Sequence, residues 1–257
     1  MAHSKVPERL RLKDVIPILW RSFFIQTGWN FKSMISIGFC FALLPVARKV
    51  CHTKEEYIRF FKRHLGFFNA HPYFASYAIG ATARLELERE IHKKPPAELI
   101  DKFKNALIGP LGAVGDQCCW AVMRPSALIF GLTGIKIAPT FGWKAFVLLL
   151  TFILYNIPHI YIRIKGILDG YESGFDVYKK IRIDTYRKLV RSFRIIGVTG
   201  IGMLFIWTFQ QAFIVHWHVS IMFVLAFALG FSLRIKRNMF YTPVLASMVL
   251  AIIIGLL

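Results

Sequence analysis

The chain has few acidic residues and little charge of any kind. Of its 257 residues, 14 are Asp or Glu and 33 are Lys or Arg, so the formal net charge is +19. Charged residues make up 18% and hydrophobic residues 56%, whereas a soluble domain carries about a quarter charged residues. So much apolar surface does not fit inside one soluble core, and its abundance also excludes disorder. The composition, with a mean hydropathy of +0.50, predicts a membrane protein.

Motifs for metal binding and catalysis are also missing. The four cysteines, Cys40, Cys51, Cys118 and Cys119, form no CxxC pair and have no zinc-like spacing to histidine. No phosphate-binding loop of the GxxxxGK[ST] type occurs, and nothing groups Ser, His and an acid into a triad. We therefore expect no metal, no cofactor and no catalytic residue.

No secretory signal peptide is evident at the start. Met1–Lys13 is polar and basic, and no small-residue cleavage site follows the first apolar stretch. The basic residues lie between apolar runs rather than among RNA-stacking motifs, which favours the cytoplasmic face of a membrane over nucleic acid. We expect the N-terminus to be cytoplasmic.

The C-terminal half carries the clearest membrane-spanning patterns. Positively charged loops tend to stay in the cytoplasm, so the nine Lys and Arg between 163 and 194 predict a cytoplasmic loop, as does the basic turn at 234–237. His216-Trp217-His218 and the C-terminus then face outside, with His216 and His218 in an interfacial belt rather than at a metal. The expected spans are Phe146–Ile162, Ile195–Val215, Val219–Leu233 and Phe240–Leu257.

The N-terminal half has shorter, interrupted apolar runs. Ile35–Val46 is too short to span, Leu65–Ala83 carries polar residues and Pro72, and Ala106–Ile137 is rich in Gly and Pro. Polar backbone freed at such positions must find partners in protein or in a watery cavity. The sequence predicts an all-α polytopic membrane protein, with broken or re-entrant helices in 1–137 and regular spans in 138–257, forming one integrated unit.

Two short stretches of the N-terminal half carry candidate ligand-binding groups. Asn69 and His71, next to Pro72, suit a hydroxyl-rich ligand; the alternative is a helix end capped by Asn69. Glu86 and Glu88 cannot share one helix face, so at most one points into a cavity, and Glu88 fits better in a solvated charge run.

Among the candidate functional segments, the glycine-rich stretch that ends at Asp116 is the most informative. It contains Gly109, Pro110 and Gly115, and Arg124 follows eight residues after the acid. One interpretation is a re-entrant loop locked by an Asp116–Arg124 ion pair, because a buried unpaired carboxylate is unfavourable. The other is a contact with a ligand or a second subunit.

Read together, these stretches resemble the IID subunit of the mannose/fructose/sorbose family of bacterial phosphotransferase-system (PTS) sugar permeases. The resemblance covers nearly the whole chain and is most specific in a GPL…GD…W…RP string. The residues that carry it include Trp29, Asn30, Phe68, Asn69, Pro72, Glu86, Gly109, Pro110, Gly115, Asp116, Trp120, Arg124 and Pro125.

The resemblance implies a non-catalytic subunit of the bacterial inner membrane. It would pair with a IIC subunit, contact membrane lipid, and move a hexose-type sugar that IIA and IIB proteins phosphorylate. Asn69, His71, Glu86 and Asp116 would then lie along the sugar path. Ala70, Leu87 and Gln117 depart from the family pattern, and the insert before the last two spans is short. A divergent scaffold or regulatory subunit without transport is the alternative.

Overall fold

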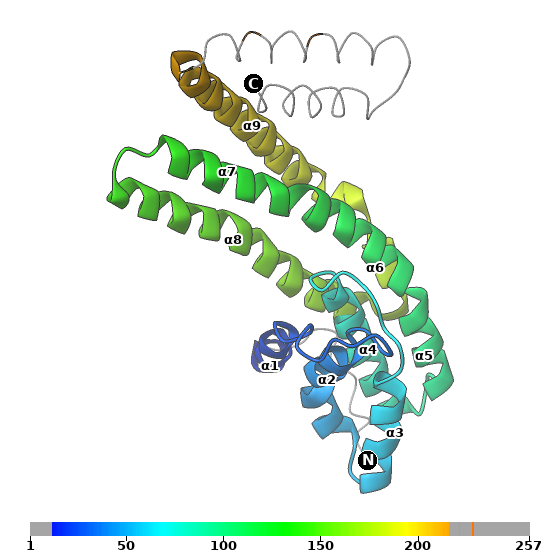
Figure 1. Ribbon diagram of the computed structural model, residues 1–257. Coiled ribbons are helices and arrows are strands. Elements are labelled where there is room, and N and C mark those ends of the chain that lie inside the picture. Colours follow the sequence, from blue (N-terminus) through cyan, green and yellow to red (C-terminus); the bar gives the residue numbers. More distant parts are fainter. Residues whose placement is uncertain (1–11, 216–220, 222–227, 229–257) are drawn as a thin grey trace.

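The computed structural model describes residues 12–215, 221 and 228, and its elements are helical throughout (Figure 1). A compact group of shorter helices lies at one end, and three long helices extend from it. The group contains α1 (Leu12–Ser22), α2 (Ser36–Val50), α3 (Lys54–His64) and α4 (Ala75–His92). The chain continues through α5 (Ala97–Ala106), α6 (Ile108–Gly115), the π-helix η1 (Asp116–Met123), α7 (Arg124–Ile137), α8 (Phe141–Ser173), the 3₁₀ turns η2 (Gly174–Lys179) and η3 (Ile183–Tyr186), and α9 (Arg187–Val215).

Three helical stretches are long and apolar enough to cross a membrane: Ala97–Ile137, Phe141–Lys179 and Ile183–Gln211. About 20 apolar residues suffice for a span. The predicted all-α membrane class is confirmed, and the predicted spans 146–162 and 195–215 lie in α8 and α9. The predicted spans 219–233 and 240–257, with His216, His218 and the basic turn, fall outside the described residues.

The glycine-rich stretch is helical, so the expected re-entrant loop at Gly109–Gly115 is wrong. α5, α6, η1 and α7 follow one another as a single curved rod of 41 residues (Figure 1). Pro110 is tolerated because it lies in the first turn of α6, where its missing N–H would have no helical partner. The eight-residue π-helix η1 absorbs the irregularity that the sequence pattern suggested would break the chain.

α4 packs backbone to backbone against the second half of α8. A Cβ at Gly80 would overlap the carbonyl oxygen of Ile167, and one at Gly170 would overlap that of Tyr77. The Tyr77 hydroxyl also bonds the Tyr186 hydroxyl at 2.6 Å. α4 is therefore buried inside protein, which is why the apolar run at 65–83 is not a lipid-exposed span.

Two connections complete the helical group. Asn30 orders the turn after α1, since its Oδ1 accepts the backbone N–H groups of Lys32 and Ser33 at 3.0 and 2.9 Å. Phe68 is fully buried against Phe39, with ring centroids 4.5 Å apart. These two family-motif residues therefore shape the segment that leads to His71, whereas the motif residue Trp29 is exposed.

Candidate functional site

The structure places the four residues expected along a sugar path in separate surroundings. Glu86 is buried on α4 beside a charged cavity of about 170 Å³. His71 lines a second cavity between α7 and α8, Asp116 is exposed on η1, and Asn69 is exposed between α3 and α4. Asn69 caps no helix, because α4 begins after Phe74. Only His71 and Asp116 lie near one another, through Gly115.

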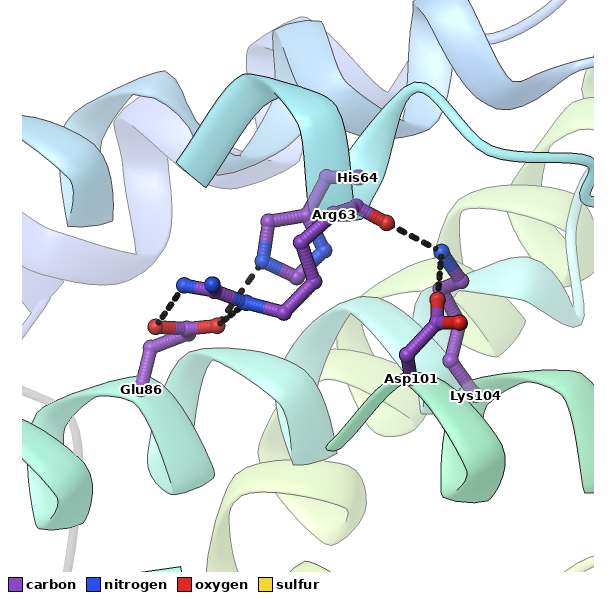
Figure 2. A network of polar contacts seen from close by, with 5 residues as sticks. All are labelled: Arg63, His64, Glu86, Asp101 and Lys104. Carbon is purple, nitrogen blue, oxygen red and sulfur yellow. Dashed lines mark hydrogen bonds and ion pairs between the residues drawn. The ribbon is translucent and has the colours of Figure 1, made fainter. Parts of the chain in front are cut away.

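Glu86 joins α4 to the end of α3. Its carboxylate accepts a two-pronged interaction from Arg63, with Nε 2.7 Å from Oε1 and the terminal nitrogen 2.9 Å from Oε2 (Figure 2). His64 Nε2 lies 2.9 Å from the same Oε1. Both carboxylate oxygens are therefore engaged, and Glu86 has little capacity left for a ligand in the neighbouring cavity.

Lys104 extends this network to α5. Its side chain is fully buried, and its Nζ donates to the carbonyl oxygen of Arg63 at 2.7 Å and pairs with Asp101 at 2.9 Å (Figure 2). Arg63, His64 and Lys104 were not among the candidate site residues that the sequence indicated. That Lys104 faces inward from α5 can be recognised only once the position of α3 against α5 is known.

The protonation states of Glu86 and His64 follow from their burial and their hydrogen bonds. Burial alone would raise the pKa of the Glu86 carboxyl, but the hydrogen bonds from His64 and Arg63 outweigh it and lower the pKa to about 2. Burial lowers the pKa of His64, and its Nδ1 has no hydrogen-bond partner. His64 is therefore neutral and donates from Nε2, while a second N–H would be stranded at Nδ1.

The expected Asp116–Arg124 ion pair does not form, and the locking role given to Arg124 is wrong. Eight residues of helix separate the two side chains by roughly 12 Å along the axis, whereas side-chain pairs on a helix form at three or four residues. Arg124 instead lies over the Trp120 ring, four residues earlier, at 4.7 Å from its centroid. Pro125 occupies the first turn of α7, where it fits without strain.

His71 fits against the start of η1. A Cβ at Gly115 would overlap the His71 side chain, so this glycine lets the two segments approach. The His71 and Trp120 rings are 5.8 Å apart. They line one side of a cavity of about 530 Å³ whose other side comes from α8 residues such as Phe152 and Asn156.

Arg163 on α8 is a buried cation that the sequence did not single out. It is 3% exposed, lies between the rings of Phe23 and Tyr73 at 5.1 and 5.0 Å, and its Nε donates to His159 Nε2 at 2.7 Å. Among the described residues no carboxylate pairs with it. The sequence pattern placed Arg163 at the start of an expected loop at 163–194. That loop is wrong as a loop, because α8 continues to Ser173 and α9 begins at Arg187, and Arg163 is buried on α8.

The outer face of α6 and η1 presents small and polar residues. Gly109 and Pro110 are exposed, and a Cβ at Gly109 would meet nothing within 4 Å in the described part of the chain, so this glycine serves no packing there. We call this exposed face of η1 the polar strip. It consists of Asp116, Gln117, Trp120 and Ala121.

Comparison with known proteins gives one consistent family. The model of the PTS system mannose/fructose/sorbose family IID component matches residues 9–225. The mannose-specific EIID component of Escherichia coli K12 is 32% identical over 198 residues, which are 77% of this chain and 68% of that protein. The fructose permease IID component of Bacillus subtilis is 28% identical, covering 77% and 70%. Among solved structures, a chain of the mannose transporter ManYZ in complex with microcin E492 superposes with a TM-score of 0.59 at 31% identity, covering 77% of this chain and 71% of that one.

Proposed function

The chain belongs to the IID components of the mannose/fructose/sorbose PTS family, and we propose that it works as the IID subunit of a sugar permease in a bacterial cytoplasmic membrane. It assembles with a IIC subunit and helps to move a hexose-type sugar inward, where IIA and IIB proteins phosphorylate it. It carries no phosphoryl group and catalyses no step itself. Its N-terminus and the basic segment 163–194 face the cytoplasm.

The observation that carries this proposal is the polar strip. Asp116 and Gln117 are exposed in the middle of a helical stretch long enough to cross the membrane. Asp116 lies about 12 Å beyond Arg124 toward the α1–α4 group, near the edge of a hydrocarbon layer, where a carboxylate still favours protein or a water-filled path over lipid. Small residues beside these polar residues, such as Gly109 and Ala113, allow another helix to approach closely. A second membrane subunit over this strip meets both requirements.

The polar residues divide between two roles. Asp116 lies where the IIC subunit would cover the chain, so it and the exposed Asn69 are our candidates for the sugar path. Their oxygens and amide suit the directional hydrogen bonds of sugar hydroxyls. Glu86 is assigned to holding α3 and α5 against α4, because its carboxylate is already fully engaged.

Sugar uptake by cells in which the two membrane subunits are restored tests the proposal. Cells that lack the gene and its IIC partner regain both subunits, and uptake of labelled hexoses is measured with IIA and IIB present. We expect uptake only when both membrane subunits are restored, and a strong reduction with Asp116→Ala. Assembly of both subunits without uptake of any hexose would contradict transport and favour the scaffold alternative.

A further inference from the structure

The cavity of about 530 Å³ between α7 and α8 has a polar end and an apolar end. Gln26, His71 and Arg124 lie among the residues of the polar end. Leu128 and Phe152 line the other end and are 56% and 65% exposed. A volume of this size is typical of sites that hold a small molecule or part of a larger one.

The polar end offers hydrogen-bond donors. His71 Nδ1 accepts the backbone N–H of Tyr73 at 3.2 Å, and burial lowers the pKa of His71 to about 3, so the ring is neutral with its proton on Nε2. That N–H has no partner within residues 12–215. Arg124 contacts the Trp120 ring and pairs with no carboxylate in the same part of the chain. Both groups therefore remain available to a ligand that accepts hydrogen bonds.

The surrounding charge favours an anion. No Asp or Glu lines the cavity. The buried Arg163 lies directly behind the Tyr73 wall, 5.0 Å from that ring, and has no carboxylate partner in the described chain. Two guanidinium groups thus face or flank one cavity, and no acidic side chain among the described residues lines it or pairs with either of them; in a low-dielectric setting this attracts an anion.

The apolar end and the depth of the cavity point to the membrane as the source of that anion. Arg124 lies roughly 20 Å along α7 from the α7–α8 turn, and Asn156 about as far along α8. If the α7–α8 turn is taken as one edge of a hydrocarbon layer ~30 Å thick, Arg124 falls toward the opposite edge, at the end of α7 that leads to the α1–α4 group, where an arginine side chain reaches toward headgroups. Leu128 and Phe152 continue from there along the lipid-facing surface between two spans.

We propose that this cavity binds one anionic phospholipid, with its phosphate between Arg124 and the His71 Nε2–H and an acyl chain along Leu128 and Phe152. Basic pockets between membrane helices are suited to such headgroups. A neutral sugar would leave both cations uncompensated and would make no use of the exposed apolar end. The site would hold the α7–α8 hairpin against the helical group through lipid rather than through protein alone.

Native mass spectrometry of the full-length chain in a non-ionic detergent tests the site. Phosphatidylglycerol and phosphatidylcholine with the same acyl chains, inorganic phosphate, and a hexose are added separately, and phosphate and the hexose are also added to the lipid-bound chain. We expect a one-to-one phosphatidylglycerol adduct that exceeds the phosphatidylcholine adduct severalfold and falls at least tenfold in Arg124→Gln. Arg124→Lys keeps the charge and should retain most of the binding.

Lys136→Gln is the matched control, because Lys136 also lies on α7 over an indole ring, that of Trp207 at 5.6 Å, but does not line this cavity. It should change the adduct less than twofold, and melting temperatures confirm that each variant is folded. Equal phosphatidylglycerol binding by Arg124→Gln and the parent chain would overturn the proposal. So would displacement of the lipid by phosphate or hexose, which would assign the cavity to a soluble ligand.

Discussion

Single residues set how closely the helices approach one another. At Gly80 the neighbouring helix leaves no room for a side chain, since a Cβ would overlap the Ile167 carbonyl oxygen. At Gly202 on α9 the same Cβ would meet no atom of the described residues within 4 Å. Identical substitutions at these two positions therefore separate packing from helix propensity.

We predict that Gly80→Ala lowers the stability of the chain by about 1–3 kcal/mol, because the rigid backbone of α8 must move away. Gly202→Ala should raise it by about 0.5–1 kcal/mol, because alanine favours the helix. Melting temperatures in detergent measure both. Equal effects of the two changes would show that α4 and α8 are not packed backbone to backbone.

Glu86 and Glu88 offer a second matched pair. Glu86 is 1% exposed and bonded to Arg63 and His64, whereas Glu88 is partly exposed and pairs with Arg84 on its own helix. Glu86→Gln should cost about 3 kcal/mol, because it leaves the Arg63 charge poorly compensated, and Glu88→Gln less than about 1 kcal/mol. If chemical denaturation finds the two variants alike, Glu86 does not hold α3 to α4.

Acid should weaken the same network. The pKa of Glu86 is about 2 in the folded chain and 4.5 ordinarily, so its ionisation stabilises the fold above about pH 4.5. That contribution, about 3 kcal/mol, is lost as the pH falls from 4.5 toward 2. The lowered pKa of His64 acts in the same direction below pH 6.5. The melting temperature of Glu86→Gln should therefore fall less steeply below pH 4.5 than that of the parent chain; parallel curves would contradict this.

Among the elements, the rod from α5 to α7 differs most from the sequence-based expectation. Three glycines and a proline suggested a broken loop, but Pro110 lies in a first turn and the π-helix η1 takes up the remaining irregularity. The Asp116–Arg124 pair was plausible only while the chain between them was free to fold back. Once that chain is helical, the axial distance excludes it. By contrast, α3 and α5 begin where local chemistry favours a helix start, because Thr53 and Glu56 form a capping box and Pro96 precedes α5.

Since Asp116 has no partner on its own rod, its substitution should leave the isolated chain intact. We predict that Asp116→Asn changes the melting temperature of the isolated chain by less than about 2 °C, as for an exposed site. The same change should reduce co-purification with the IIC subunit severalfold. A large destabilisation of the isolated chain would mean that Asp116 serves this chain's own fold.

At the scale of the molecule, the sequence predicted the class, the family and the spans in α8 and α9, because long apolar runs and an extended motif depend little on tertiary detail. It could not place the site. Which of Asn69, His71, Glu86 and Asp116 share a cavity depends on how α4 packs on α8 and how far η1 extends the rod. The Glu86 carboxylate binds Arg63 instead of facing a ligand. Arg163 is a buried cation only because α1 and Tyr73 enclose it, which the sequence does not show.

The central claim is that the polar strip of a membrane-spanning rod docks onto a second membrane subunit. Site-specific photo-crosslinking in cells that contain the IIC subunit tests it most directly, with the reactive group at position 117 and, as control, at the exposed apolar position 149 of α8. We predict a crosslink to IIC from position 117 and none from position 149. Crosslinks to lipid alone from position 117, in cells where both subunits accumulate, would contradict the claim.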